Sequence, residues 1–224
     1  MKAGIVTFPG SNCDDDAYYA LTHLAGFQGE RHWHKSTPDF SDCDLVILPG
    51  GFSYGDYLRC GAMAAVSPIM ESVKAFAGKG GLVLGICNGF QILCEAGLLP
   101  GALARNSGLT FSCQDVVLKV ESNQGPWTNE LTAGQTLTIP IAHGDGRYVI
   151  PEAEVERMRS RGEILLTYQN NPNGSVGDIA GVCNAQKNVF GLMPHPERAT
   201  DLRSRDGMKI WRSVVNFLEK RRRS

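Results

Sequence analysis

The sequence predicts an α/β fold, in which an open, mostly parallel sheet carries helices on both faces and antiparallel strands follow in the second half. Short, continuously apolar segments at residues 3–8, 45–48 and 82–84 alternate with helix-like segments. Strands that are apolar throughout are buried on both faces, which is typical of parallel βαβ units in three layers. The 224 residues, 42% hydrophobic and 20% charged, are enough for a single domain spanning residues 1–224.

Local sequence patterns predict the helices of the first half. Residues 11–12 (SN) predict an N-cap, and the helix that follows has an acidic first turn and an apolar face reaching residue 25. After the strand at 45–48 and its Pro-Gly-Gly turn, a helix is expected over residues 63–77. The strand at 82–84 leads into a helix over residues 90–96.

The second half has a different pattern. Residues 115–121 alternate between apolar and polar side chains, as a half-exposed strand does. Further strands are expected at residues 135–141, 164–168, 179–182 and 189–193, the last two as a hairpin-like pair. Residues 170–174 (NNPNG) predict a turn, and residues 206–220 predict a closing helix with a wide apolar face.

The composition excludes several classes of protein. A formal net charge of −1 gives no general surface for nucleic acid or membrane. The seven cysteines are scattered without a C-x-x-C pair, which argues against a disulfide framework and against a zinc ribbon. The start of the chain lacks the apolar region of a signal peptide, and no apolar run approaches the roughly 18 residues of a membrane span. A reducing, cytoplasmic location is therefore expected.

The most informative motif is at residues 85–89 (GICNG), between a predicted strand and a predicted helix. Cys87 lies between two glycines at a point where the chain must turn sharply, as in a nucleophile elbow. A helix N-terminus beside the thiol favours its anionic, reactive form. A lone cysteine is more commonly a small core residue, so Cys87 becomes a candidate nucleophile only with further support.

That support comes from residues 194–197 (PHPE). Proline on both sides of His195 fixes the backbone and excludes regular helix or strand at that position. Glu197 is placed to orient the imidazole and to stabilise its charged form. Because Cys87 and His195 are far apart in the sequence, only the fold can bring them together as a Cys-His-Glu triad.

The remaining candidate motifs are weaker. Gly50 and Gly51 follow a predicted parallel strand, where backbone N–H groups would suit a developing oxyanion. The same glycine-rich stretch lacks the Lys-Ser/Thr ending of a phosphate loop. Residues 32–34 (HWH) have no acidic or thiol partner at ligand spacing nearby, so no metal site is predicted. His143, in a glycine-rich loop, is left open between a substrate, a partner and a backbone contact.

Several segments together resemble a known family. Residues 49–51 (PGG), 85–91 (GICNGFQ) and 194–197 (PHPE) resemble the three signature regions of class I, triad-type glutamine amidotransferases. More narrowly, the chain is similar to the glutaminase subunits of phosphoribosylformylglycinamidine synthases. That likeness lies in residues 8–14 (FPGSNCD), 50–57 (GGFSYGDY), 141–148 (IAHGDGRY) and 171–175 (NPNGS). Asp145 departs from the glutamate expected at its position.

The resemblance implies a flavodoxin-like sheet and a catalytic triad of Cys87, His195 and Glu197. It further implies an oxyanion hole from the backbone of Gly51 and Asn88. The predicted glutamine contacts are Gly50, Gln91 and Asn106, with no metal and no cofactor in this chain.

By the same resemblance, the chain would hydrolyse L-glutamine to glutamate and ammonia, in de novo purine biosynthesis. The ammonia would pass to a large synthetase subunit that uses ATP and Mg²⁺ to make formylglycinamidine ribonucleotide, with a small third subunit in the complex.

Three other functions remain open from the sequence. A γ-glutamyl peptidase would use the same triad without a partner. A catalytically silent binding subunit would retain the fold alone. A redox-sensing cysteine protein is a third possibility, although such sensing requires neither residues 194–197 nor Gln91.

Overall fold

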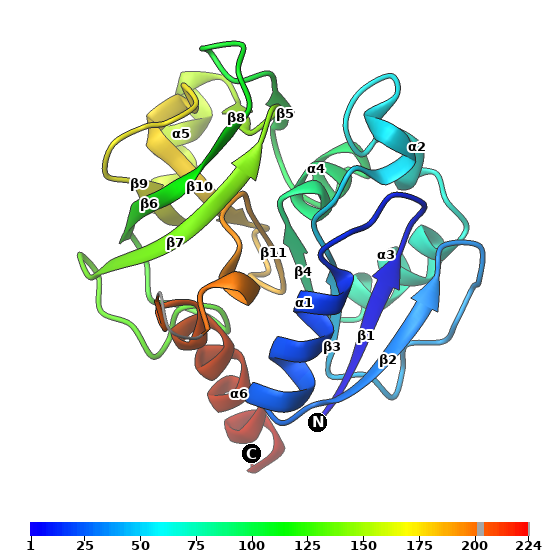
Figure 1. The fold of residues 1–224 in the computed structure, drawn as a ribbon. Helices are drawn as coiled ribbons and strands as arrows, with labels where there is room; N and C mark the ends of the chain where they lie inside the picture. Colours follow the sequence, from blue (N-terminus) through cyan, green and yellow to red (C-terminus); the bar gives the residue numbers. More distant parts are fainter. Residues whose placement is uncertain (201–203, 224) are drawn as a thin grey trace.

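The computed structural model describes residues 1–200 and 204–223, and its main feature is a nine-stranded mixed sheet (Figure 1). The strand order is β2-β1-β3-β4-β11-β10-β9-β6-β7. The strands of the first half are β1 (Lys2–Thr7), β2 (Gln28–Trp33), β3 (Leu45–Leu48) and β4 (Leu82–Ile86). Those of the second half are β6 (Ser112–Val120), β7 (Thr136–His143), β9 (Ile164–Tyr168), β10 (Ile179–Cys183) and β11 (Val189–Leu192). A separate two-stranded sheet pairs β5 (Ala102–Ala104) with β8 (Arg147–Val149).

The predicted α/β class is confirmed, and the two halves pair as expected. The first half of the sheet is parallel, from β2 through β1, β3 and β4 to β11. From β11 onward, each strand pairs antiparallel with the next, in the order β10, β9, β6 and β7. The antiparallel strands therefore extend the parallel sheet. The predicted hairpin is the pair β10 and β11.

Helices cover both faces of the parallel half (Figure 1). Helix α1 (Asp14–Tyr19), the π-helical turn η1 (Ala20–Leu24) and α6 (Gly207–Arg223) lie on one face. Helices α3 (Ile69–Gly78) and α4 (Asn88–Glu95) lie on the other, and α2 (Ala62–Ala65) packs against α4 beyond the ends of the strands. Outside these layers are α5 (Glu152–Ser160) and three 3-10 turns, η2 (Ser53–Asp56), η3 (Val176–Asp178) and η4 (Pro196–Arg198).

Local predictions differ from the structure at two helices. The predicted N-cap at Ser11 and Asn12 is wrong, because Cys13 precedes α1 and the Ser11 hydroxyl instead accepts a hydrogen bond from the N–H of Phe8. The helix predicted over residues 63–77 is two helices, α2 and α3. Pro68 immediately precedes the second one and has no N–H to continue the first.

The buried strands form one core with the inner faces of the helices. All residues of β3, β4, β9, β10 and β11 are buried, as expected for strands covered on both sides. Among the described residues, none of the helices combines the length and the apolar character needed to cross a membrane.

Candidate active site

The predicted site residues follow the carboxyl ends of neighbouring parallel strands. Strands β1, β3, β4 and β11 are consecutive in the sheet. The loops after them carry Cys13, Gly51, Cys87 and His195, respectively. In open α/β sheets the loops at this edge are where binding and catalytic sites are built.

Cys87 lies at the sharp turn between β4 and α4. Its φ of 50° and ψ of −104° are outside the regions that a residue with a side chain normally adopts. The turn brings α4 against the backbone of β3, and only glycine at position 89 allows this approach. A Cβ on Gly89 would lie 1.9 Å from the carbonyl oxygen of Leu48. A Cβ on Gly85 would lie 2.6 Å from the backbone of Gly89. The glycine on each side of Cys87 is therefore required by close backbone packing, as the sequence predicts.

The turn is tied to the neighbouring strand. Strands β4 and β11 pair in parallel, with Ile86 opposite Leu192. The backbone N–H of Cys87 donates to the carbonyl oxygen of Leu192 at 2.8 Å. Because His195 follows Leu192 by three residues, this pairing places the imidazole beside the thiol.

His195 and Glu197 form a buried ion pair. The Nδ1 atom of His195 lies 2.6 Å from Oε1 of Glu197, and their side chains are 2% and 0% exposed. The backbone N–H of His195 donates to the carbonyl oxygen of Pro140, which fixes the start of the turn. Gly207 of α6 packs against the turn from outside, since a Cβ there would lie 2.0 Å from the carbonyl oxygen of Pro196.

The environment of His195 favours its protonated form. Burial by itself lowers the pKa of the imidazole, but the carboxylate of Glu197 and the thiol of Cys87 raise it well above its usual value. The Nε2 atom of His195 is buried and has no hydrogen-bond partner among the described residues. It is therefore available to a substrate atom or to the thiol.

Cys87 and His195 line one pocket of about 210 Å³. Its other lining residues are Asn12, Cys13, Gly51, Phe52, Phe111, Ala142 and Arg198. The thiol of Cys87 donates to the carbonyl oxygen of Ala142 at 3.6 Å. The structure thus brings the predicted nucleophile and the predicted base to one small cavity, and the carboxylate of Glu197 pairs with the imidazole beside it.

The two predicted oxyanion donors lie beside this pocket. Asn88 is the first residue of α4, so its backbone N–H has no acceptor within the helix. Gly51 lines the pocket with a φ of 145°, and a Cβ there would lie 2.8 Å from the backbone of Ser11. Gly50 is also closely packed, because a Cβ there would lie 2.8 Å from Cε1 of His195.

The side chain of Asn88 links three loops around the site. Its Oδ1 accepts from the N–H of Ser53 at 3.2 Å, and its Nδ2 donates to Oε1 of Gln91 at 2.8 Å. The Nε2 of Gln91 in turn donates to the carbonyl oxygen of Asp145 at 2.7 Å. Both amide ends of Gln91 are therefore occupied, and its role as a glutamine contact stays a prediction.

Asn106 lies away from the pocket in a buried network. Its amide nitrogen donates to the carbonyl oxygens of Thr110 and His143, and its Oδ1 accepts from the N–H of Gly146. Burial, together with the nearby His195, lowers the pKa of His143 to about 4, so this imidazole is neutral at pH 7. The geometry gives Asn106 and His143 the task of holding the loop after β7.

Sequence reasoning missed a second thiol at the site. Cys13 is buried beside His195, and a Cβ on Gly50 would lie 3.1 Å from its sulfur. Burial raises the pKa of the Cys13 thiol, and its interaction with His195 opposes that change. The available signal was its place in the loop after β1, at the same sheet edge as the other site residues.

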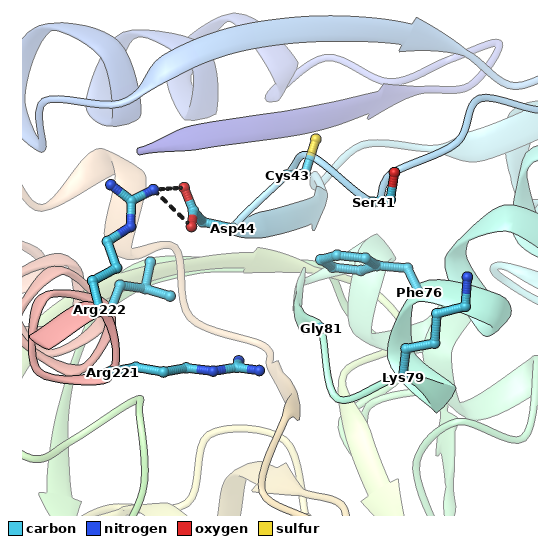
Figure 2. A pocket seen from close by; sticks show the side chains of 9 residues that line it. Ser41, Cys43, Asp44, Phe76, Lys79, Gly81, Arg221 and Arg222 are labelled. Carbon is cyan, nitrogen blue, oxygen red and sulfur yellow. Dashed lines mark hydrogen bonds and ion pairs between the residues drawn. The ribbon is translucent and has the colours of Figure 1, made fainter. Parts of the chain in front are cut away.

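A larger cavity lies at the opposite end of the strands. It measures about 390 Å³ and is lined by Ser41, Cys43, Asp44, Phe76, Lys79, Gly81, Leu218, Arg221 and Arg222 (Figure 2). Asp44 precedes β3, whereas Cys87 follows the parallel strand β4, so this cavity and the thiol are at opposite edges of the sheet. Figure 2 shows the guanidinium of Arg222 paired with the carboxylate of Asp44, with contacts of 2.7 and 3.0 Å.

Comparison with known proteins agrees with this geometry. Residues 1–213 match the family described as the CobB/CobQ-like glutamine amidotransferase domain. The chain belongs to this glutamine amidotransferase family.

Within the family, the similarity extends to proteins of one name. The phosphoribosylformylglycinamidine synthase subunit PurQ of Alkaliphilus metalliredigens is 56% identical over 221 residues, covering 98% of this chain and 97% of the relative. The PurQ subunit of a Nostoc species is 54% identical over 218 residues, covering 96% and 97%. A chain in the structure of PurLQS from Thermotoga maritima superimposes with a TM-score of 0.89 at 48% identity, covering 97% of this chain and 98% of that one.

Proposed function

We propose that this chain is the glutaminase subunit of a phosphoribosylformylglycinamidine synthase. It would hydrolyse L-glutamine and supply ammonia for de novo purine biosynthesis. The observation that carries the proposal is the strained turn at Cys87, held in register with the strand that leads to the buried pair of His195 and Glu197. The identity of 56% to a phosphoribosylformylglycinamidine synthase subunit named PurQ supports this synthase as the reaction that uses the ammonia.

In the first half of the reaction, the Cys87 thiolate attacks the side-chain amide carbon of glutamine. The carbonyl π electrons move to oxygen, and the backbone N–H groups of Gly51 and Asn88 are the proposed donors to that oxyanion. In enzymes where one such donor has been removed, the activation free energy rises by about 3–4 kcal/mol. As the intermediate collapses, protonated His195 gives its proton to the departing nitrogen, and ammonia leaves.

In the second half, water cleaves the γ-glutamyl thioester. His195, now neutral, accepts a proton from the attacking water, and the thiolate leaves as glutamate forms. Glu197 orients the imidazole through Nδ1 and stabilises the imidazolium in both halves. The reaction uses no redox step, so we propose that this chain needs no cofactor and that ATP and Mg²⁺ belong to the synthetase.

The proposed setting is a complex in a reducing compartment. All seven cysteines are free thiols, and a thiolate nucleophile needs protection from oxidation. The proposed partners are a large synthetase subunit and a small third subunit, and the PurLQS structure of Thermotoga maritima is a precedent for such an assembly. Free ammonia is mostly protonated at neutral pH, so direct transfer to the synthetase avoids loss of the nucleophile.

The test is the variant Cys87→Ser in the complete complex. Glutamine-dependent synthesis should fall by at least about 10⁴-fold, because the hydroxyl lacks an activated thiolate, while synthesis from added ammonia should be unchanged. Loss of both activities would assign Cys87 to folding or assembly. An electrophilic glutamine analogue should add mass to Cys87 in the wild-type chain, and no labelling would favour a silent binding subunit. Release of glutamate from γ-glutamyl peptides without any partner would favour a peptidase.

A further inference from the structure

The two proposed oxyanion donors come from different segments of the chain. Gly51 lies in the loop after β3, and Asn88 is the first residue of α4. Neither backbone N–H donates to another group among the described residues, so both are available to a substrate oxygen. Two donors stabilise one oxyanion only when they converge on it. The loop after β3 must therefore be held at a fixed place against α4.

A buried hydrogen bond joins this loop to the helix. The N–H of Ser53 donates to Oδ1 of Asn88 at 3.2 Å, and the two residues are 2% and 1% exposed. On either side of Ser53, the backbone N–H groups of residues 52 and 54 donate instead to the loop after β1, at 2.9 and 2.7 Å. The side chain of Asn88 thus holds the segment that follows Gly51, and it does so from the helix that carries the second donor.

A chain of contacts fixes the orientation of the Asn88 amide. Nε2 of Gln91 donates to the backbone carbonyl oxygen of Asp145 at 2.7 Å, and a carbonyl oxygen can only accept. The other end of the Gln91 amide, Oε1, therefore faces Asn88 and accepts from its Nδ2 at 2.8 Å. This leaves Oδ1 of Asn88 toward Ser53, where an acceptor is needed.

Helix capping does not account for an asparagine at position 88. The N-cap of α4 is Cys87, whose side chain makes no capping hydrogen bond. Asparagine is favoured at the N-cap itself, one residue earlier, and is only a moderate helix former beyond it. Burying its amide costs free energy unless both ends are bonded, and Ser53 and Gln91 supply those bonds. These two contacts explain the residue type.

We infer that the side chain of Asn88 is a positioning residue for the proposed glutamine hydrolysis. It holds the loop after β3 so that the N–H of Gly51 and the N–H of Asn88 converge on the developing oxyanion. This inference rests on the proposed function. Removing an oxyanion donor outright costs about 10²- to 10³-fold in kcat. Misplacing a reacting group by about 1 Å can cost about 100-fold, so losing this contact has a measurable effect on turnover.

The experiment measures Asn88→Ala in the complete complex, because alanine removes the amide and keeps the backbone N–H. The kcat for glutamate release should fall about 10- to 100-fold with KM unchanged, since bound glutamine carries no oxyanion. Alkylation of Cys87 by iodoacetamide, followed by mass spectrometry, should keep its wild-type rate. In that displacement sulfur bonds to a saturated carbon as iodide leaves, and no oxyanion develops.

The matched control is Asn188→Ala. This asparagine is also buried, and its Nδ2 donates to the carbonyl oxygens of Ala77 and Gly81 at 2.8 and 2.9 Å. It precedes β11, at the opposite end of that strand from His195. The substitution should lower the melting temperature, because it removes two hydrogen bonds, and should leave kcat unchanged.

A second variant, Gln91→Leu, tests the chain of contacts one step further from the oxyanion and serves if Asn88→Ala does not fold. Its kcat should fall with KM unchanged, because the Asn88 amide is then free to turn. A higher KM with wild-type kcat would make Gln91 a glutamine contact and would overturn its place in the chain of contacts.

Wild-type kcat in Asn88→Ala would overturn the inference. An equal loss of kcat and of Cys87 alkylation would also overturn it, because the side chain would then support the fold of the whole site. Absence of glutamate release by the wild-type complex would count against the proposed function instead.

Discussion

The proposed nucleophile and the proposed base follow neighbouring strands, but different forces hold them. At the end of β4, Cys87 is placed by close backbone packing, with glycines on both sides and a positive φ. At the end of β11, His195 is placed by fixed backbone and by charge, with prolines on both sides and the buried carboxylate of Glu197 at 2.6 Å. Close backbone packing therefore positions Cys87, and a fixed backbone together with the charge of Glu197 positions His195.

The difference follows from what each group must do. A thiol attacks along one direction, so its backbone has to be rigid and the adjacent helix N-terminus close. An imidazole must hold and release a proton within one catalytic cycle, so its protonation balance has to be set. We therefore expect changes at β11 to alter chemistry with the fold retained, and changes at β4 to alter stability.

The largest effect is expected for Glu197→Gln, which keeps the shape of the side chain and removes its charge. Without the carboxylate, the imidazolium loses its partner and the ring tautomer is no longer fixed. Glutamine hydrolysis should fall about 10²- to 10⁴-fold, with the pKa of His195 in the pH–rate profile lowered. Steady-state glutamate release across pH measures this. The control Glu156→Gln, on the exposed face of α5, should be silent, and a Glu197→Gln variant with wild-type activity would remove Glu197 from the triad.

The next effect is expected for Gly89→Ala, which tests the packing at β4. The new Cβ would lie 1.9 Å from the carbonyl oxygen of Leu48, so strand and helix must separate. The free energy of unfolding should fall by about 3 kcal/mol, measured by urea denaturation.

Gly78→Ala is the matched control, because a Cβ at Gly78, in the last position of α3, meets nothing within 4 Å. It should stabilise the chain by about 0.5–1 kcal/mol. Equal effects of the two substitutions would show that close packing is not what requires glycine at position 89.

The smallest effect is a pH dependence of stability from the buried pair. Because the pKa of His195 is raised in the folded state, the protonated imidazole stabilises the fold fully below its unfolded pKa of about 6.5. That stabilisation is lost as the pH rises from there through the folded pKa, with a slope of about 1.4 kcal/mol per pH unit from this group. Urea unfolding of wild type and His195→Gln across this range measures the difference. The same slope in both proteins would contradict a raised pKa.

The sequence predicts the turn at Cys87 well, but it predicts two of the helices and the surroundings of His195 less well. Residues 85–89 predict the turn and the need for glycine, because these depend on a few adjacent residues. The N-cap of α1 and the single helix over residues 63–77 were wrong. At α1, Ser11 hydrogen-bonds back to Phe8 in a turn that ends β1, and Pro68 interrupts the other helix. The thiol of Cys13 beside His195 escaped notice, because its position depends on how β1 lies relative to the other strands.

The sequence by itself determined the local chemistry: a nucleophile at a glycine-bounded turn, an imidazole between prolines, and the alternation of apolar strands with helices. These features are encoded within a few residues, where sterics and hydrogen bonding act directly. Only the tertiary structure decided that β11 pairs in parallel with β4, and with it the meeting of Cys87 and His195. Strand order depends on which apolar faces bury one another across the whole chain, and no short segment contains that information.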